Sequence, residues 1–311
     1  MADHEKEIGR RSRVFAVIPT LLTLGNAVCG FGAITFAAMV GPEELTPSGP
    51  VSSAANQLLF NAAGLIFLAM VFDALDGSVA RLTKQTSDFG AQLDSLCDVV
   101  SFGVAPAFIM LKLMHPDHKL MESIAKLPFQ YSPRLLWAIA VLFMVSAILR
   151  LARFNAETDE SDSHDHFSGL PSPAAAGVIA SFPIGLQEIR AVAIEPELPK
   201  QSALTFGTSY GDISISVLAL LLPIITICVS LLMVSRVRYP HVVNQFLRGS
   251  GNRTKLLKIV FSLLLVFVIR EMALPVLFCY FAFAAPVKIA WQKSWLWIQS
   301  RRRERISARG A

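Results

Sequence analysis

Four aspartates stand near the junction of two long apolar runs, where charged side chains are rare. Asp73 and Asp76 are three residues apart near the end of one run, and Asp94 and Asp98 are four residues apart near the start of the next. Offsets of three and four place each pair on one face of its own helix. The segment between the runs, residues 81–90, is short enough to make the two helices antiparallel neighbours. We therefore expect the four carboxylates to converge at one point near the membrane surface.

The chemistry of these carboxylates suits a hard divalent cation. A charge at mid-bilayer costs on the order of 3 kcal/mol, and less near the interface, so ionisable residues within spans are candidates for function. Solvated helix ends are the alternative, but Asp73 and Asp98 have apolar neighbours on both sides. Four like charges repel unless cations bind between them. Carboxylate ligands select Mg, Mn or Ca, and Mg favours one or two carboxylates plus a substrate phosphate.

Small residues and an arginine extend the pattern toward a phosphorylated substrate. Gly77 follows Asp76 directly, and a glycine there allows another group to approach the helix backbone closely. Arg81 lies four residues further on, where its guanidinium can bridge two phosphate oxygens. Gly90 is expected to play a matching part on the next helix, and Ala80 keeps its face of the helix small.

The elements that must position these residues are expected to be membrane helices. Of the 311 residues, 53% are hydrophobic and 16% charged, against roughly 25% charged in a typical soluble domain. A helix needs ~20 mostly apolar residues to cross ~30 Å of hydrocarbon. Eight runs come near this length, at residues 14–40, 57–80, 90–113, 135–154, 172–192, 213–235, 256–270 and 272–291. Because the last two are short and adjoining, six or seven spans or a re-entrant hairpin are the alternatives.

The placement of Lys and Arg predicts the orientation. With the N-terminus inside, the cytoplasmic segments hold 21 of the 28 basic residues, as the positive-inside rule requires. Both termini and the aspartate stretch should then face the cytoplasm. The run after Arg13 is about twice as long as the ~7 to 15 apolar residues of a signal peptide, so we expect a retained span. The net charge of +5 fits anionic lipid headgroups and calls for no nucleic acid.

The four cysteines predict no separate site. They lie within apolar runs at no metal-ligand spacing, so neither a disulfide framework nor a zinc site is expected. We expect all four to be small residues that pack between helices: Cys29, Cys97, Cys228 and Cys279.

Written out, the acidic pattern is Asp73-x2-Asp76-Gly77-x2-Ala80-Arg81-x8-Gly90-x3-Asp94-x3-Asp98. At every position it resembles the signature of the CDP-alcohol phosphotransferase family. The resemblance implies a homodimeric six-helix membrane core that binds two divalent cations, Mg or Mn, and the CDP of a CDP-linked lipid. It implies that Asp73, Asp76 and Asp94 are metal ligands, and that Asp98 is the general base and also lies at the metals. The residues expected on the CDP and phosphate side are Asn26, Gly77, Ala80, Arg81 and Gly90.

The implied reaction moves a phosphatidyl group from CDP-diacylglycerol to an alcohol and releases CMP. Phosphoryl transfer requires charge neutralisation and in-line positioning more than covalent help. Asp98 would accept the hydroxyl proton of the incoming alcohol. Three stretches, residues 18–34, 149–155 and 169–177, resemble the bacterial branch of the family that makes phosphatidylserine. They predict L-serine as the acceptor, with glycerol 3-phosphate, inositol phosphate and choline as alternatives. Thr20 departs from the asparagine expected after the proline.

These stretches also supply candidate residues for the acceptor or its phosphate. Arg150 and Arg153 are one turn apart at the cytoplasmic end of the fourth span, suited to phosphate or to a serine carboxylate, with positive-inside anchoring as the alternative. Asn155 is expected to begin an acidic loop. Ser172 lies between two prolines, where a broken helix frees backbone groups that can line a cavity. Asn26, in the first span, is expected to contact the nucleotide, or else to pair with a neighbouring helix.

The apolar runs predict an all-α polytopic membrane protein, and the resemblance implies the bacterial inner membrane, with the active site at the cytoplasmic face. The family core is expected over residues 1–238, and a C-terminal membrane extension of about two helices with a basic cytoplasmic tail over residues 239–311. A divalent-cation transporter is the alternative from another class, because acids within spans can line an ion path. Such a path needs polar groups through the full membrane depth, whereas here they cluster at the cytoplasmic third.

Overall fold

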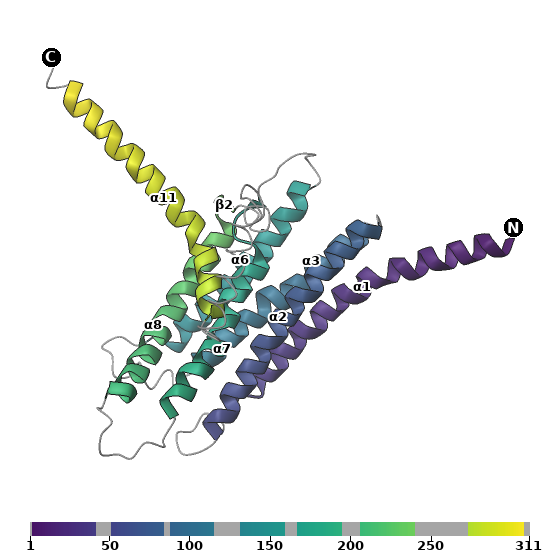
Figure 1. The fold of residues 1–311 in the computed structure, drawn as a ribbon, viewed down its shortest axis with the longest axis horizontal. Coiled ribbons are helices and arrows are strands. Elements are labelled where there is room, and N and C mark those ends of the chain that lie inside the picture. Colours follow the sequence, from purple (N-terminus) through teal and green to yellow (C-terminus); the bar gives the residue numbers. More distant parts are fainter. Residues whose placement is uncertain are drawn as a thin grey trace, which may run out of the picture.

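The computed structural model of the chain describes residues 2–41, 51–83, 88–114, 131–158, 167–194, 206–239 and 273–307. Their elements are helical apart from one pair of two-residue strands (Figure 1). In chain order they are α1 (Ala2–Ala38), α2 (Val51–Thr83), α3 (Asp88–Asp98), the π-helix η2 (Val99–Val104), α4 (Ala105–Leu113), α6 (Pro133–Thr158), β1 (Phe167–Ser168), α7 (Ser172–Ile194), α8 (Phe206–Val234), β2 (Arg238–Tyr239) and α11 (Ala273–Ser307).

Four of the helical segments are long and apolar enough to cross a membrane, namely residues 19–38, 55–79, 89–113 and 133–156. Shorter apolar segments follow at residues 172–186, 220–234 and 273–288. The prediction of an all-α polytopic membrane protein is therefore confirmed. Seven of the eight predicted runs correspond to these segments, and the run at residues 256–270 lies outside the described residues.

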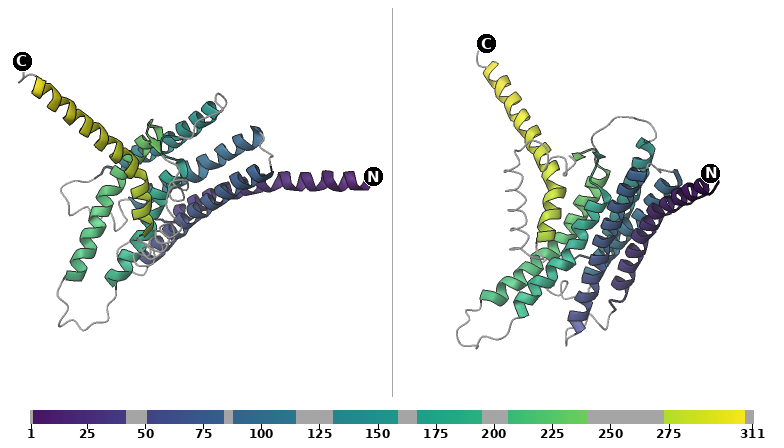
Figure 2. Two further views of the ribbon diagram at one scale, coloured as in Figure 1. Left: turned by 45° about the horizontal axis from the view of Figure 1, so that its top comes forward. Right: turned by 45° about the vertical axis from the view of Figure 1, so that its right-hand side comes forward.

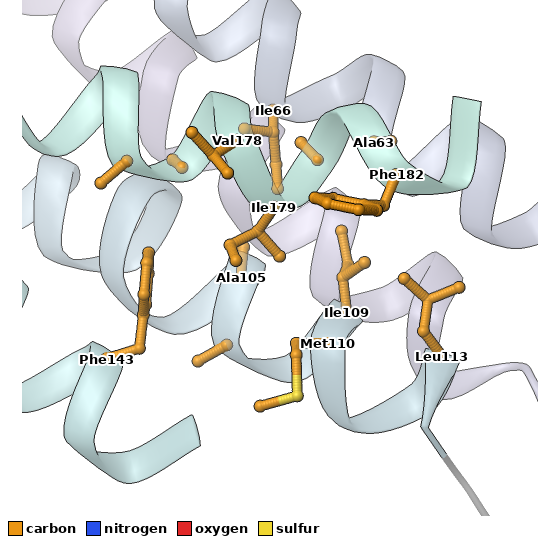
Figure 3. Packing of buried hydrophobic residues seen from close by; sticks show 14 of the residues in the cluster. Ala63, Ile66, Ala105, Ile109, Met110, Leu113, Phe143, Val178, Ile179 and Phe182 are labelled. Carbon is orange, nitrogen blue, oxygen red and sulfur yellow. The ribbon is translucent and has the colours of Figure 1, made fainter. Parts of the chain in front are cut away.

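Helix α7 lies at the centre of the bundle and packs against α2, α8 and α11. Twelve consecutive residues of α7, 175–186, are buried, as expected of a helix that is apolar on every side. Ile179 and Phe182 of α7 meet Ile66 of α2 and Ile109 of α4 in the hydrophobic cluster (Figure 3). This packing fixes the helices that carry the aspartates against a rigid interior, because well-packed side chains leave few voids.

The third membrane crossing is not one regular α-helix. It begins as α3, widens to a π-helix immediately after Asp98 and continues as α4. Ser101 in η2 is fully buried, and its hydroxyl donates a hydrogen bond of 2.9 Å to the backbone oxygen of Asn26 in α1. Gly30 permits this approach, since a Cβ at that position would come within 2.7 Å of the Ser101 Cα. π-Helical turns often mark functional sites, and this one follows an expected catalytic residue.

A short antiparallel strand pair ties the turn before α7 to the segment after α8. Phe167 pairs with Tyr239, and Ser168 pairs with Arg238. Gly169 follows with a positive φ of 89°, where a side chain is strained, and a Cβ there would also collide with the Met233 backbone oxygen. Its N–H donates 2.9 Å to the Val237 oxygen. The turn before Ser172 is therefore closed by backbone bonds.

Helix α11 packs its apolar first half on the bundle and then leads away from it, as both views of Figure 2 show. Phe278 presses on Gly177 of α7 and lies 5.5 Å, ring centre to ring centre, from Phe67 of α2. The second half carries the exposed Trp291 and Trp295. Helix α11, which falls within the predicted extension over residues 239–311, is thus packed against α7.

The close contact between α1 and η2 predicts that Gly30→Ala destabilises the protein by about 1 to 3 kcal/mol, the usual cost of overpacking. A lower midpoint of thermal unfolding in detergent is the expected result. The matched control is Gly64→Ala in α2, where a Cβ meets no atom within 4 Å; its midpoint should be unchanged or slightly higher. A Gly30→Ala protein as stable as the wild type would contradict the packing described above.

Candidate active site

Three carboxylates meet where α2 and α3 lie together. One oxygen each from Asp73, Asp76 and Asp94 can be chosen so that all three lie within 4.8 Å of one another. Asp76 is buried, and the other two are partly buried. The predicted convergence of the two helical pairs is therefore present in the fold, because the short connection brings both ends to the same place.

Asp98 lies one turn further along α3 than Asp94 and is almost completely buried, with 7% of its surface exposed. Its charge acts on those of Asp73, Asp94 and Asp76, so it belongs to the same cluster. Asn26 of α1, which is fully buried, donates a hydrogen bond from Nδ2 to Asp98 Oδ1 at 2.9 Å. The pairing with a neighbouring helix, one of the two expected roles of Asn26, is present in the structure; its contact with a nucleotide stays a prediction.

Thr23 is a site residue that the sequence analysis missed. Its hydroxyl lies 2.7 Å from Asp76 Oδ2 and 3.0 Å from the backbone oxygen of Pro19. Thr23 stands three residues before Asn26, so the two side chains share one face of α1. That spacing of two polar residues within an apolar run was the available signal. Helix α1 thus contacts one aspartate of each helical pair.

The donor set fits a divalent metal. All three clustered groups are hard oxygen ligands, the kind that Mg and Mn prefer. Asp94 Oδ1 is buried and accepts no hydrogen bond from the described residues. A buried polar atom without a partner is costly, and a cation at the cluster would compensate it. Asp73, Asp76 and Asp94 are the residues that would hold such an ion, with Asp98 beside them.

The expected phosphate-side residues lie on the two helices of the cluster. Gly77 and Arg81 are in α2, where Gly77 follows a metal-site aspartate, and Gly90 is in the first turn of α3. A Cβ at Gly77 would meet no protein atom within 4 Å. Packing among the described residues therefore does not require glycine there, and the contact of Gly77 with a phosphate stays a prediction. Ala80 and Arg81 lie in the last turn of α2, and the predictions for their side chains stay predictions.

Arg150 of α6 lies beside the cluster, and its charge acts on both Asp98 and Asp73. Its Nη1 donates a hydrogen bond of 2.9 Å to the hydroxyl of Ser172, which is fully buried at the start of α7. The buried Arg150 Nε has no hydrogen-bond partner among the described residues. Two of the residues expected for the acceptor are thus brought together, next to the expected base.

Asn155 was expected to begin a loop, and this detail was wrong. It lies inside α6, which continues to Thr158, and its Nδ2 donates 2.9 Å to the Ser95 hydroxyl of α3. Ser95 directly follows a metal-site aspartate, so Asn155 joins α6 to the helix of the cluster. Arg153, also in α6, is partly buried. The longer helix follows from the sequence, since residues 150–158 contain neither glycine nor proline to end it.

A sequence profile of the CDP-alcohol phosphatidyltransferase family matches residues 16–199, and these include all four aspartates and their partners in α1, α6 and α7. The match spans more than half of the chain. The chain therefore belongs to the CDP-alcohol phosphatidyltransferase family, as the spacing of the aspartates indicated.

Individual relatives point in the same direction. The chain is similar to a CDP-diacylglycerol--serine O-phosphatidyltransferase of Mycobacterium tuberculosis strain H37Rv, at 33% identity over 175 residues, which are 55% of this chain and 50% of that protein. A protein of the same name from Methanocaldococcus jannaschii is 39% identical over 125 residues, 40% of this chain and 51% of the relative. An archaetidylserine synthase of Methanothermobacter thermautotrophicus is 35% identical over 170 residues, 54% of this chain and 58% of the relative. The chain thus matches about half the length of these curated relatives.

The carboxylate geometry predicts that Asp94→Asn weakens Mn²⁺ binding by at least about tenfold. Mutation of a residue that only hydrogen-bonds a metal ligand usually lowers the metal affinity by that much, and loss of a ligand should lower it at least equally. Free Mn²⁺ can be measured by electron paramagnetic resonance on the protein in detergent. Asp88→Asn is the control, since it removes an acid six residues earlier on the same helix and should leave the affinity unchanged. Equal affinity in the Asp94→Asn and wild-type proteins would contradict the metal site.

Proposed function

We propose that the chain is a metal-dependent transferase that moves the phosphatidyl group of CDP-diacylglycerol to the hydroxyl of L-serine, giving phosphatidylserine and CMP. The observation that carries the proposal is the cluster of Asp73, Asp76 and Asp94 beside the buried Asp98. Membership in the CDP-alcohol phosphatidyltransferase family and the names of the relatives support it. The proposed site lies at the cytoplasmic face of a bacterial inner membrane, with both termini on that side.

The aspartates of the cluster hold the charged part of the donor in this proposal. When bound, divalent cations, Mg or Mn and two in number, supply positive charge to the pyrophosphate and to the leaving CMP. Asp73, Asp76 and Asp94 fix where that charge lies, and Arg81 adds a guanidinium for the phosphate oxygens. Gly77 leaves room beside the α2 backbone. This division of work fits phosphoryl transfer, in which positioning and charge stabilisation provide most of the catalysis.

Asp98 acts as the general base. The serine oxygen forms a bond to the phosphorus on the lipid side, and the bond from that phosphorus to the bridging oxygen breaks as CMP leaves. The serine proton passes to the Asp98 carboxylate. Asn26 donates to one oxygen of that carboxylate, so the side chain is held in one orientation and the other oxygen can face the substrate. A fixed base is effective because proton transfer requires hydrogen-bond distance and alignment.

The acceptor side is assigned to α6 and the start of α7. Arg150 is partly buried, its charge acts on Asp73 and Asp98, and one of its nitrogens donates to Ser172. A guanidinium suits a carboxylate, which it can bind through two parallel hydrogen bonds. Arg153 and Asn155 complete the proposed acceptor side. The alternative acceptors are glycerol 3-phosphate, inositol phosphate and choline, of which only choline lacks an anionic group for Arg150.

The proposal also covers the division of the chain into a core and an extension, and its assembly into a dimer. A family core over residues 1–238, a C-terminal membrane extension over residues 239–311 and a homodimer are expected from the resemblance. Membership in the family disfavours the alternative of a divalent-cation transporter. The described acids of the cluster also lie together at one end of α2 and α3, which suits a site at one surface better than a path through the membrane.

The proposed base predicts that Asp98→Asn lowers CMP release by about 100-fold or more, because the amide keeps the shape of the carboxylate and loses its basicity. Initial rates with CDP-diacylglycerol, serine and Mn²⁺ provide the measurement. Thermal unfolding should be close to that of the wild type, and Asp88→Asn should keep full activity. An Asp98→Asn enzyme with more than a tenth of the wild-type rate would exclude Asp98 as the base.

The proposed acceptor predicts CMP release with serine and not with glycerol 3-phosphate, inositol phosphate or choline, each offered separately to the purified protein with CDP-diacylglycerol and Mn²⁺. Thin-layer chromatography should show phosphatidylserine as the product. Release with another alcohol only would leave the role of the aspartates intact and overturn the choice of serine. Failure with all four would count against the proposed transferase.

A further inference from the structure

Tyr239 lies well beyond the family match and far along the chain from the aspartates, and it joins two other segments of the bundle. It is the last residue of β2, and only 2% of its surface is exposed. Its backbone pairs with Phe167 of β1, and its hydroxyl donates a hydrogen bond of 2.9 Å to the backbone oxygen of Ala282 in α11. Its ring lies 6.0 Å from that of Phe281. Tyr239 therefore links α11 to the turn before α7.

The partner of this hydroxyl has a specific reason to accept it. In an α-helix the oxygen of residue 282 receives the N–H of residue 286. Residue 286 is a proline inside α11, which has no N–H to give. Tyr239 supplies the donor that the helix lacks. Burial raises the pKa of Tyr239 to about 12, so the hydroxyl keeps its proton over the working range of pH.

The other end of the link leads to the acceptor side. Next to the Phe167 pair, the Gly169 N–H donates to Val237 and the Leu170 N–H donates to the Leu232 oxygen at 3.0 Å. Gly169 fits there only because it has no side chain. Two residues after Leu170 comes Ser172, which is fully buried. The strand pair and the two backbone bonds thus set the position of the Ser172 hydroxyl.

That hydroxyl accepts the hydrogen bond from Arg150, whose charge acts on Asp73 and Asp98. We infer that Tyr239 is a positioning residue for the acceptor alcohol: by tying β2 to α11 it holds the turn of Ser172, and through Ser172 the guanidinium of Arg150. The inference rests on the proposed function, and it gives the segment after residue 199 a part in the reaction. Tyr239 itself touches none of the reacting groups.

Tyr239→Phe tests this role, because it removes the hydroxyl and keeps the buried ring. The KM for serine should rise about three- to tenfold, the effect of losing one hydrogen bond. The KM for CDP-diacylglycerol and the Mn²⁺ affinity should stay within about twofold, since the aspartates do not depend on the turn. The matched control is Tyr280→Phe, a tyrosine on α11 with 73% of its surface exposed, which should change none of these quantities.

Pro286→Ala separates positioning from stability. It gives the Ala282 oxygen an N–H from its own helix, and a carbonyl can accept two hydrogen bonds, so the single variant should keep the wild-type KM for serine. Tyr239→Phe alone leaves the Ala282 oxygen without a donor and should lower the midpoint of thermal unfolding. In Tyr239→Phe combined with Pro286→Ala, that oxygen again accepts a hydrogen bond, and the midpoint should return toward the wild-type value. The KM for serine should remain raised, because β2 is still untied from α11.

Two results would overturn the inference. One is a Tyr239→Phe enzyme whose KM for serine equals that of the wild type. If Tyr239→Phe alone does not fold, the same comparison is made between the double variant and Pro286→Ala. The other is a KM that returns to normal together with stability in the double variant, which would make Tyr239 a purely structural residue. Both differ from failure of the proposed function, in which the wild-type enzyme itself releases no CMP with serine.

Discussion

The structure depends on bringing four carboxylates together at one end of a membrane bundle. Like charges at this distance repel, and the low dielectric around buried groups strengthens the repulsion. Three neighbouring polar side chains reduce that cost. Thr23 contacts Asp76, Asn26 donates to Asp98, and Arg150 brings a positive charge. The unpartnered oxygen of Asp94 is the part of the cluster that the described residues leave for a cation.

The surrounding helices hold these polar groups in place. Buried α7 provides a rigid centre, and α1 approaches η2 closely at Gly30, so that Asn26 and Ser101 lock the two segments together. A site that requires several oxygens at fixed separations needs such support, because small displacements weaken both metal binding and proton transfer. The aspartates lie on helices α2 and α3, and hydrogen bonds from side chains on the neighbouring helix α1 orient two of their carboxylates.

Much of the fold and the acidic part of the site could be predicted from the sequence. Long apolar runs define membrane helices, and offsets of three and four align Asp73 with Asp76 and Asp94 with Asp98. The pairs Thr23–Asp76 and Asn26–Asp98 could not be predicted, because their members are 53 and 72 residues apart and nothing local specifies which helices touch. The π-helix was also missed, since a buried apolar run shows no periodicity that would reveal a wider turn. Pro286 indicates a carbonyl without its usual donor, but only the tertiary structure identifies Tyr239 as the replacement.

The link from Tyr239 to Ala282 also has a consequence for the order in which the protein is completed during synthesis. The aspartates of α2 and α3 are all synthesised before residue 100, whereas the carbonyl that Tyr239 binds belongs to the last described helix. Chains grow from the N-terminus at about 5 to 20 residues per second. The aspartates are therefore synthesised about 10 to 40 seconds before the carbonyl of α11 that fastens the turn of Ser172. Packing of α11 is then a late step that joins two parts of the site made at different times.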